Sequence, residues 1–191
     1  MSIAFIKWNR NGLCGAACAH MALRALNPIA FGPTIAAQDS IWKSIKDHTH
    51  GRSKGQCCVE MPEEFDVKGD VCPGDTCAKC WWSYPTALRA ALIANLPKGT
   101  TVTVRKPPDE DAANDIIRSC LARGGVPIVL VDSGLHWVVV ANWNATTQKI
   151  RLFDPANPGP TTIKVAKWNV ERMLTVECGT YDNKHVVVEV G

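Results

Sequence analysis

The chain has 191 residues, of which 46% are hydrophobic and 20% are charged, and its formal net charge is +3. This length and composition fit one globular domain with a proper hydrophobic core. Lysine and arginine are scattered without a run of five, which argues against a nucleic-acid partner or an anionic membrane surface.

The first predicted helix begins at a cysteine. Residues 16 to 26 are good or tolerable helix formers, and Gly12 and Gly15 flank Cys14 where a turn becomes a helix. Free backbone N–H groups and the helix dipole favour a thiolate at that point, and Gly15 leaves the sulfur open to a substrate carbonyl. Cys14 is therefore a candidate nucleophile, although a small apolar residue on a buried helix explains it equally well.

The remaining elements place helices before strands. A second helix is predicted from an N-cap at Thr34 to about Lys46. Further helices are predicted at 83–95, 110–123 and 170–174, and strands at 99–105, 126–131, 135–143, 149–153, 161–165 and 185–190. This order predicts a single α+β domain over residues 1–191, with a mostly antiparallel sheet packed against the N-terminal helices.

A cysteine-rich loop is predicted as an insertion in this domain, at about residues 47–82, where all periodicity is lost. It holds five of the nine cysteines, namely Cys57, Cys58, Cys72, Cys77 and Cys80. Their thiolates offer a structural zinc site, and disulfides explain the same residues outside a reducing cytosol. Free thiols are the third alternative, and all three stay open.

A cysteine nucleophile needs a base to take its proton and a third group to orient that base. His136 begins one predicted strand, and Asp154 ends the next strand of the same hairpin. The two residues lie at about the same distance from the centre of the turn, so antiparallel pairing predicts that they stand nearly opposite. Taken singly, a half-buried histidine and a turn former before proline are ordinary. Together with Cys14, they favour one shared site.

Two neighbours of Cys14 on the first helix need separate interpretations. His20 is a rival base, but an offset of six residues turns it about 240° round the helix from Cys14. We interpret it as a surface or capping histidine. Cys18 lies one turn below Cys14, and we interpret it as core packing rather than as a resolving thiol.

Three segments together resemble a known family: Asn11-Gly12-Leu13-Cys14-Gly15-Ala16-Ala17, Leu135-His136-Trp137-Val138-Val139-Val140 and Phe153-Asp154-Pro155. They look like papain-like cysteine peptidases of the bacteriocin-processing type, which clip leader peptides at a double glycine on bacterial ABC exporters. By motif, the resemblance covers roughly residues 8–26 and 126–160. It implies a papain-like fold with Cys14 as nucleophile, His136 as base and acid, and Asp154 as orienter. No cofactor is required for this catalysis.

The sequence departs from that family at the oxyanion hole. The family usually carries a glutamine about six residues before the cysteine, and here that residue is Trp8. We expect Asn9 or Asn11 to donate the amide hydrogen bond instead, with Asn9 preferred because Asn11 lies in the tight approach to the helix. If neither reaches, hydrolysis should be slow, since one lost donor costs on the order of a hundredfold in rate.

We therefore predict a cysteine peptidase that acts on proteins or peptides at small-residue, Gly-Gly-like sites. From the sequence we expect neither a signal peptide nor a transmembrane segment or pro-segment. We interpret it as cytoplasmic or as delivered within a larger protein, as for an antibacterial effector or toxin domain that an immunity protein covers. Two alternatives remain: a deamidase, transglutaminase or other amidase with the same triad, and a non-enzymatic binding module stapled by zinc or disulfides.

Overall fold

The structure is a computed structural model and describes residues 3–8, 13–50, 85–132, 136–169 and 185–191. The helices in these ranges are α1 (Cys14–Leu26), α2 (Ile35–His50), α4 (Pro85–Asn95), α5 (Glu110–Ala122) and α6 (Val165–Lys167). The strands are β1 (Val102–Arg105), β2 (Val126–Val131), β3 (His136–Asn144), β4 (Lys149–Phe153), β5 (Thr161–Lys164) and β6 (Val187–Val190). None of the described helices combines the length and the apolar character that crossing a bilayer requires.

The six described strands form one sheet in the order β1-β6-β2-β3-β4-β5, and every neighbouring pair is antiparallel. The predicted α+β class with an antiparallel sheet is thereby confirmed. The position of β6 was not predicted: the last strand inserts between β1 and β2 and pairs with both. The C-terminal strand therefore joins the β1 edge to the hairpins that carry the candidate site.

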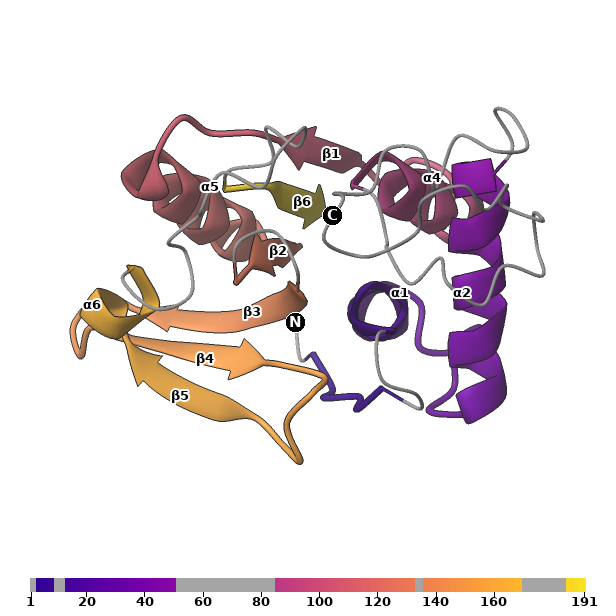
Figure 1. Cartoon of the computed structure of the whole chain (residues 1–191), viewed down its shortest axis with the longest axis horizontal. Coiled ribbons are helices and arrows are strands. Elements are labelled where there is room, and N and C mark those ends of the chain that lie inside the picture. Colours follow the sequence, from indigo (N-terminus) through magenta and orange to yellow (C-terminus); the bar gives the residue numbers. More distant parts are fainter. Residues whose placement is uncertain (1–2, 9–12, 51–84, 133–135, 170–184) are drawn as a thin grey trace, which may run out of the picture.

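Both faces of the sheet are buried at β2, in its interior. Helices α1, α2 and α4 gather on one side in Figure 1, and α5 with α6 on the other. Side chains of β2 alternate between the two cores: Ile128 and Leu130 pack in the core of α1, whereas Val129 and Val131 pack with α5. This two-sided burial explains why β2 is an uninterrupted apolar run in the sequence.

The helix starts follow the predicted capping chemistry. The side chain of Thr34 accepts a hydrogen bond from the N–H of Ala37 at 3.3 Å, and that of Asp109 accepts one from Ala112 at 2.8 Å. The predicted end of the second helix at Lys46 was wrong, because α2 continues to His50. Residues 35–50 contain no glycine or proline, so no helix-breaking residue ends α2 before Gly51. The predicted insertion therefore begins later than residue 47, and its remaining residues lie outside the described ranges.

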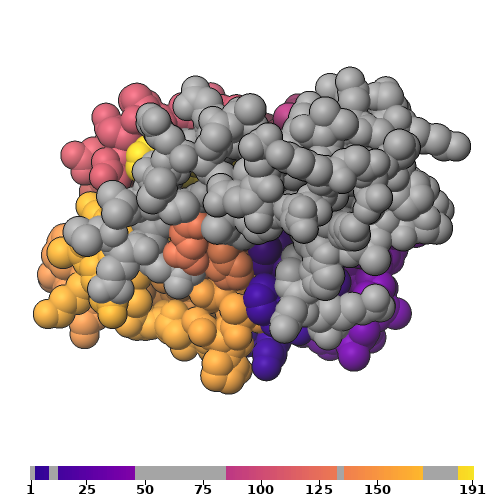
Figure 2. Space-filling view, viewed as in Figure 1, coloured from indigo at the N-terminus to yellow at the C-terminus, as the bar shows by residue number. Residues whose placement is uncertain are grey.

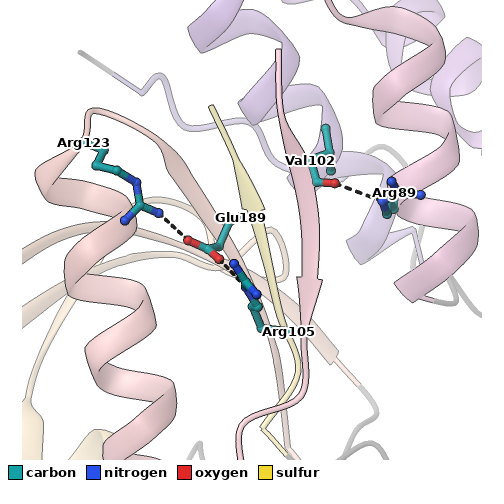
Figure 3. A network of polar contacts seen from close by, with 5 residues as sticks. All are labelled: Arg89, Val102, Arg105, Arg123 and Glu189. Carbon is teal, nitrogen blue, oxygen red and sulfur yellow. Dashed lines mark hydrogen bonds and ion pairs between the residues drawn. The ribbon is translucent and has the colours of Figure 1, made fainter. Parts of the chain in front are cut away.

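The edge formed by β1 and β6 carries a small ionic network (Figure 3). The Glu189 carboxylate on β6 accepts from Arg105 of β1 at 2.9 Å and from Arg123, which caps α5, at 2.5 Å. Both arginines are more than half exposed, at 55% and 64%, so each pair contributes little on its own. The network links β1 and the end of α5 to one residue of β6, Glu189.

Gly125 gives a test of the packing between the end of α5 and β6, because it directly precedes β2 and lies against Cys120 of α5 and Val190 of β6. A Cβ atom at Gly125 would lie 2.8 Å from Cys120 Sγ and 2.9 Å from the Val190 carbonyl oxygen. We expect Gly125→Ala to lower the free energy of unfolding by roughly 1–3 kcal/mol through overpacking. Urea unfolding followed by far-UV circular dichroism measures this, with Gly159→Ala as control because that Cβ would meet no atom within 4 Å. Equal midpoints for the two variants would contradict the close approach.

Candidate active site

Cys14 is the first residue of α1, as the glycine-flanked turn predicted. Leu13 is the N-cap residue, no side chain among the described residues caps the first turn, and that turn holds no acidic residue. The N–H groups of the first turn are therefore not engaged by a capping side chain, and the positive end of the helix dipole lies at the sulfur. Only 8% of Cys14 is exposed, so the thiol lies in a largely desolvated position.

His136 and Asp154 are hydrogen-bonded, with 2.7 Å between Nε2 of the imidazole and Oδ1 of the carboxylate. The Asp154 carboxylate is buried and also accepts from the N–H of Ala156 at 3.0 Å. The backbone carbonyl of Asp154 accepts a hydrogen bond from the N–H of Asn157, and this bond closes the turn after β4. The backbone of the turn therefore fixes the position of the Asp154 carboxylate, which also contacts the imidazole.

The two residues meet across the hairpin diagonally. We expected them nearly opposite, but the hairpin pairs Asn144 with Lys149, so its turn is centred later in the chain than that expectation assumed. Because Val139 pairs with Phe153, the residue after Phe153 falls opposite Val138 instead of His136. The extra residue between Val140 and Asn142 brings Asp154 one position closer to His136 than the pairs beside the turn would place it. The contact still forms, because diagonal neighbours on one face stay within reach of long side chains.

The electrostatics of His136 reflect both partners. Burial disfavours the charged imidazole, but the hydrogen bonds that it donates to Asp154 and Cys14, together with their negative charges, outweigh burial and raise the pKa of His136 to about 9. Asp154 engages Nε2, so Nδ1 is the nitrogen that remains for the Cys14 thiol. The carboxylate thereby fixes the tautomer in which a neutral imidazole can accept the thiol proton.

The structure therefore brings Cys14, His136 and Asp154 together in one hydrogen-bonded series. They come from the start of α1, the start of β3 and the turn after β4, which are far apart in the sequence. A thiol, an imidazole and a carboxylate in this order can carry out nucleophilic acyl transfer. None of these groups requires a metal ion for that chemistry.

Other predicted residues lie outside the described ranges. They are the two oxyanion candidates and the five cysteines of the insertion, namely Asn9, Asn11, Cys57, Cys58, Cys72, Cys77 and Cys80. Within the described ranges, no three His, Cys, Asp or Glu side chains are grouped to hold a metal ion. The oxyanion donor and the zinc or disulfide alternatives of the insertion accordingly stay predictions.

His20 and Cys18 have different outcomes. The interpretation of His20 as a surface or capping histidine was wrong: it is fully buried, and its Nε2 bonds the Gly32 carbonyl at 2.7 Å. All residues from Cys14 to Leu23 are buried, because α1 lies between the sheet and α2, so even its far face is covered. Cys18 is a core residue as expected, and burial, followed by the charges of Cys14 and Asp154, raises the pKa of its thiol.

Sequence reasoning missed the role of Trp8 at this site. Its indole ring lies edge-on to the His136 imidazole, with 5.8 Å between ring centroids and an interplanar angle of 78°. The only sequence feature that pointed to Trp8 was its position six residues before Cys14, where the resembling family carries a glutamine. That position indicated a missing donor and gave no indication of a ring contact.

Comparisons with known proteins add little to this geometry. No protein-family model matches the chain, and no curated protein matches it significantly in sequence. Among solved structures, the crystal structure of the Pseudomonas avirulence protein AvrPphB aligns with a TM-score of 0.44 and 13% identity, over 100% of this chain and 97% of that one. So distant a likeness leaves the function to be argued from this chain's own side chains.

The raised pKa of His136 gives a direct test of the Asp154 contact. In the wild type, the imidazole should titrate near pH 9, so the imidazolium predominates at neutral pH. Asp154→Asn keeps a hydrogen-bond acceptor but removes the negative charge, so the midpoint should fall toward the ordinary 6.5. NMR titration of the imidazole C–H protons measures both values, with His136→Ala to assign the resonance. The same midpoint in both proteins would show that Asp154 does not set the charge of His136.

Proposed function

We propose that this protein is a cysteine peptidase that cleaves peptide bonds through Cys14, His136 and Asp154. The observation that carries the proposal is the continuous hydrogen-bonded series from the Cys14 thiol through His136 to the Asp154 carboxylate. A buried histidine bonded to a carboxylate occurs in many proteins without catalysis. A cysteine at an uncapped helix N-terminus on the other side of that histidine supplies the nucleophile as well.

The geometry assigns each group a step. His136 holds the proton of the Cys14 thiol as an imidazolium, and the sulfur attacks the carbonyl carbon of the scissile bond. As the tetrahedral intermediate collapses, His136 gives that proton to the leaving amine, and the acyl group remains on sulfur. His136 then takes a proton from the water that attacks the thioester. The bond between the acyl carbon and sulfur breaks, the carboxylic acid product leaves, and the proton on His136 is again shared with the Cys14 sulfur. Asp154 keeps the imidazole in one tautomer and stabilises its charged form.

The oxyanion of each tetrahedral intermediate needs donors close to the sulfur. The backbone N–H groups of the first turn of α1 are suited to this role, because no capping side chain occupies them. We propose that the side chain of Asn9 or Asn11 completes the hole. This assignment extends the prediction from sequence.

The burial of the site supports a substrate with little side-chain bulk at the scissile bond. Only 8% of Cys14 and 14% of the His136 side chain are exposed. A carbonyl carbon must approach the sulfur closely, so small residues such as glycine are the best fit beside it. We propose a protein or peptide substrate of this kind. The effector role and the restraining immunity protein stay predictions.

The proposal predicts that cleavage depends on one sulfur. Cys14→Ala should abolish the appearance of new peptide N-termini in a treated bacterial proteome, because the Cys14 thiol is the one that contacts His136 among the cysteines that the structure describes. Mass spectrometry of labelled N-termini measures this, and Cys120→Ala is the control, since Cys120 lies on α5 in the other core region and away from the triad.

Each result of this experiment decides between the proposed activities. New termini that vanish only in Cys14→Ala support the peptidase. A mass increase of about one dalton at glutamine, without new termini, would replace it by deamidation at the same triad. Equal cleavage by Cys14→Ala would exclude Cys14 as the nucleophile. No change of either kind, together with no selective alkylation of Cys14 at mildly acidic pH, would favour a binding module.

A further inference from the structure

The N-terminal segment, residues 3–8, braces the turn that carries Asp154. Phe5 packs edge-on against Phe153, the last residue of β4, with 5.8 Å between ring centroids. The N–H of Trp8 donates to the Pro155 carbonyl at 3.3 Å. In Figure 1 this segment runs below α1, between the ends of β4 and β5 and α2.

The same segment is also tied to α2. The side-chain amide of Gln38 donates to the Lys7 carbonyl at 3.1 Å. Figure 2 shows the indigo N-terminal region at the surface, between the orange strands and the purple α2. The segment therefore connects α2 to Pro155, the residue after Asp154. Trp8 is the last described residue of the segment.

Two hydrogen bonds leave the His136 ring one degree of freedom. Asp154 holds Nε2 and Cys14 holds the other side of the ring, and together these contacts define an axis about which the imidazole can still tilt. The Trp8 indole lies against the ring at 5.8 Å and 78°, so it blocks that tilt. It also covers the imidazole, where water would weaken the ion pair with Asp154.

We propose that Trp8 is a positioning residue that acts through His136. Its indole keeps the imidazole plane aligned with Cys14 and Asp154, and its backbone bond to Pro155 couples this alignment to the Asp154 turn. The inference rests on the proposed function, because it concerns the base of that reaction. In this proposal, the role of Trp8 differs from that of the glutamine that the resembling family carries at this position, which donates to the oxyanion.

Three substitutions of Trp8 separate the possible roles. Trp8→Ala should lower kcat on the order of a hundredfold with little change in KM, because a misaligned base is costly and substrate binding does not use the indole. Trp8→Phe keeps an aromatic ring against the imidazole and should stay within a few-fold of the wild type. Trp8→Gln supplies an amide donor without the ring and should resemble Trp8→Ala. A peptide spanning a cleavage site mapped as above serves as substrate.

Phe5→Leu is the matched control, because Phe5 belongs to the same segment and packs against Phe153 without a ring contact to His136. It should keep wild-type kcat. An equal loss in Phe5→Leu and Trp8→Ala would overturn the proposal, since the segment as a whole would then be responsible. An active Trp8→Gln with an inactive Trp8→Phe would also overturn it and assign hydrogen-bond donation instead.

A spectroscopic measurement tests the contact without any substrate. A protonated imidazole quenches the emission of an indole in contact with it, so the emission of wild type minus Trp8→Phe should rise as pH passes about 9, where His136 loses its proton. In a His136→Ala background the difference should not titrate. A flat difference in the wild type would overturn the proposal. Because this readout needs no cleavage, it stays decisive even if the protein is not a peptidase.

Discussion

The hydrogen bond between His136 Nε2 and Asp154 Oδ1 is the contact on which the rest of the site depends. It assigns the tautomer of the imidazole, and so decides which nitrogen faces Cys14. It also offsets the cost of burying a charged ring, since burial alone would lower the pKa of His136 and its partners raise it to about 9. Without the carboxylate, the thiol would face a base that burial keeps neutral and that no group orients.

The fold supplies this contact through rigid elements. β3 lies in the interior of the sheet between β2 and β4, with side chains of successive residues packed in the two cores, so His136 projects from a strand that is held on both faces. α1 is buried over its first ten residues, from Cys14 to Leu23, and it is fixed to the following loop by the bond from His20 to Gly32. Sites built on packed strands and helices hold their geometry better than sites on loops.

The sequence was sufficient to predict these elements and the meeting of His136 with Asp154, because each depends on a local pattern. Small residues around Cys14 indicate a helix start, and two apolar strands joined by a polar turn predict the hairpin that ends at Asp154. What it did not predict depends on contacts between distant segments. The insertion of β6 beside β2 and the burial of His20 follow from packing against elements far away in the chain. The extra residue in β3 is a feature of its pairing with β4, which the apolar alternation of one strand does not encode.

Burial has two opposing effects on this site. A desolvated thiol and imidazole react more readily once charged, yet desolvation opposes their charging. The structure resolves this by placing opposite charges in contact on both sides of the ring, so that the imidazolium is stabilised by neighbours instead of by water. That solution holds only while water stays out and the ring keeps its plane, because a tilt loosens both hydrogen bonds together. A bulky apolar ring such as Trp8 beside the imidazole meets both requirements with one side chain, which an amide at the same position could not do.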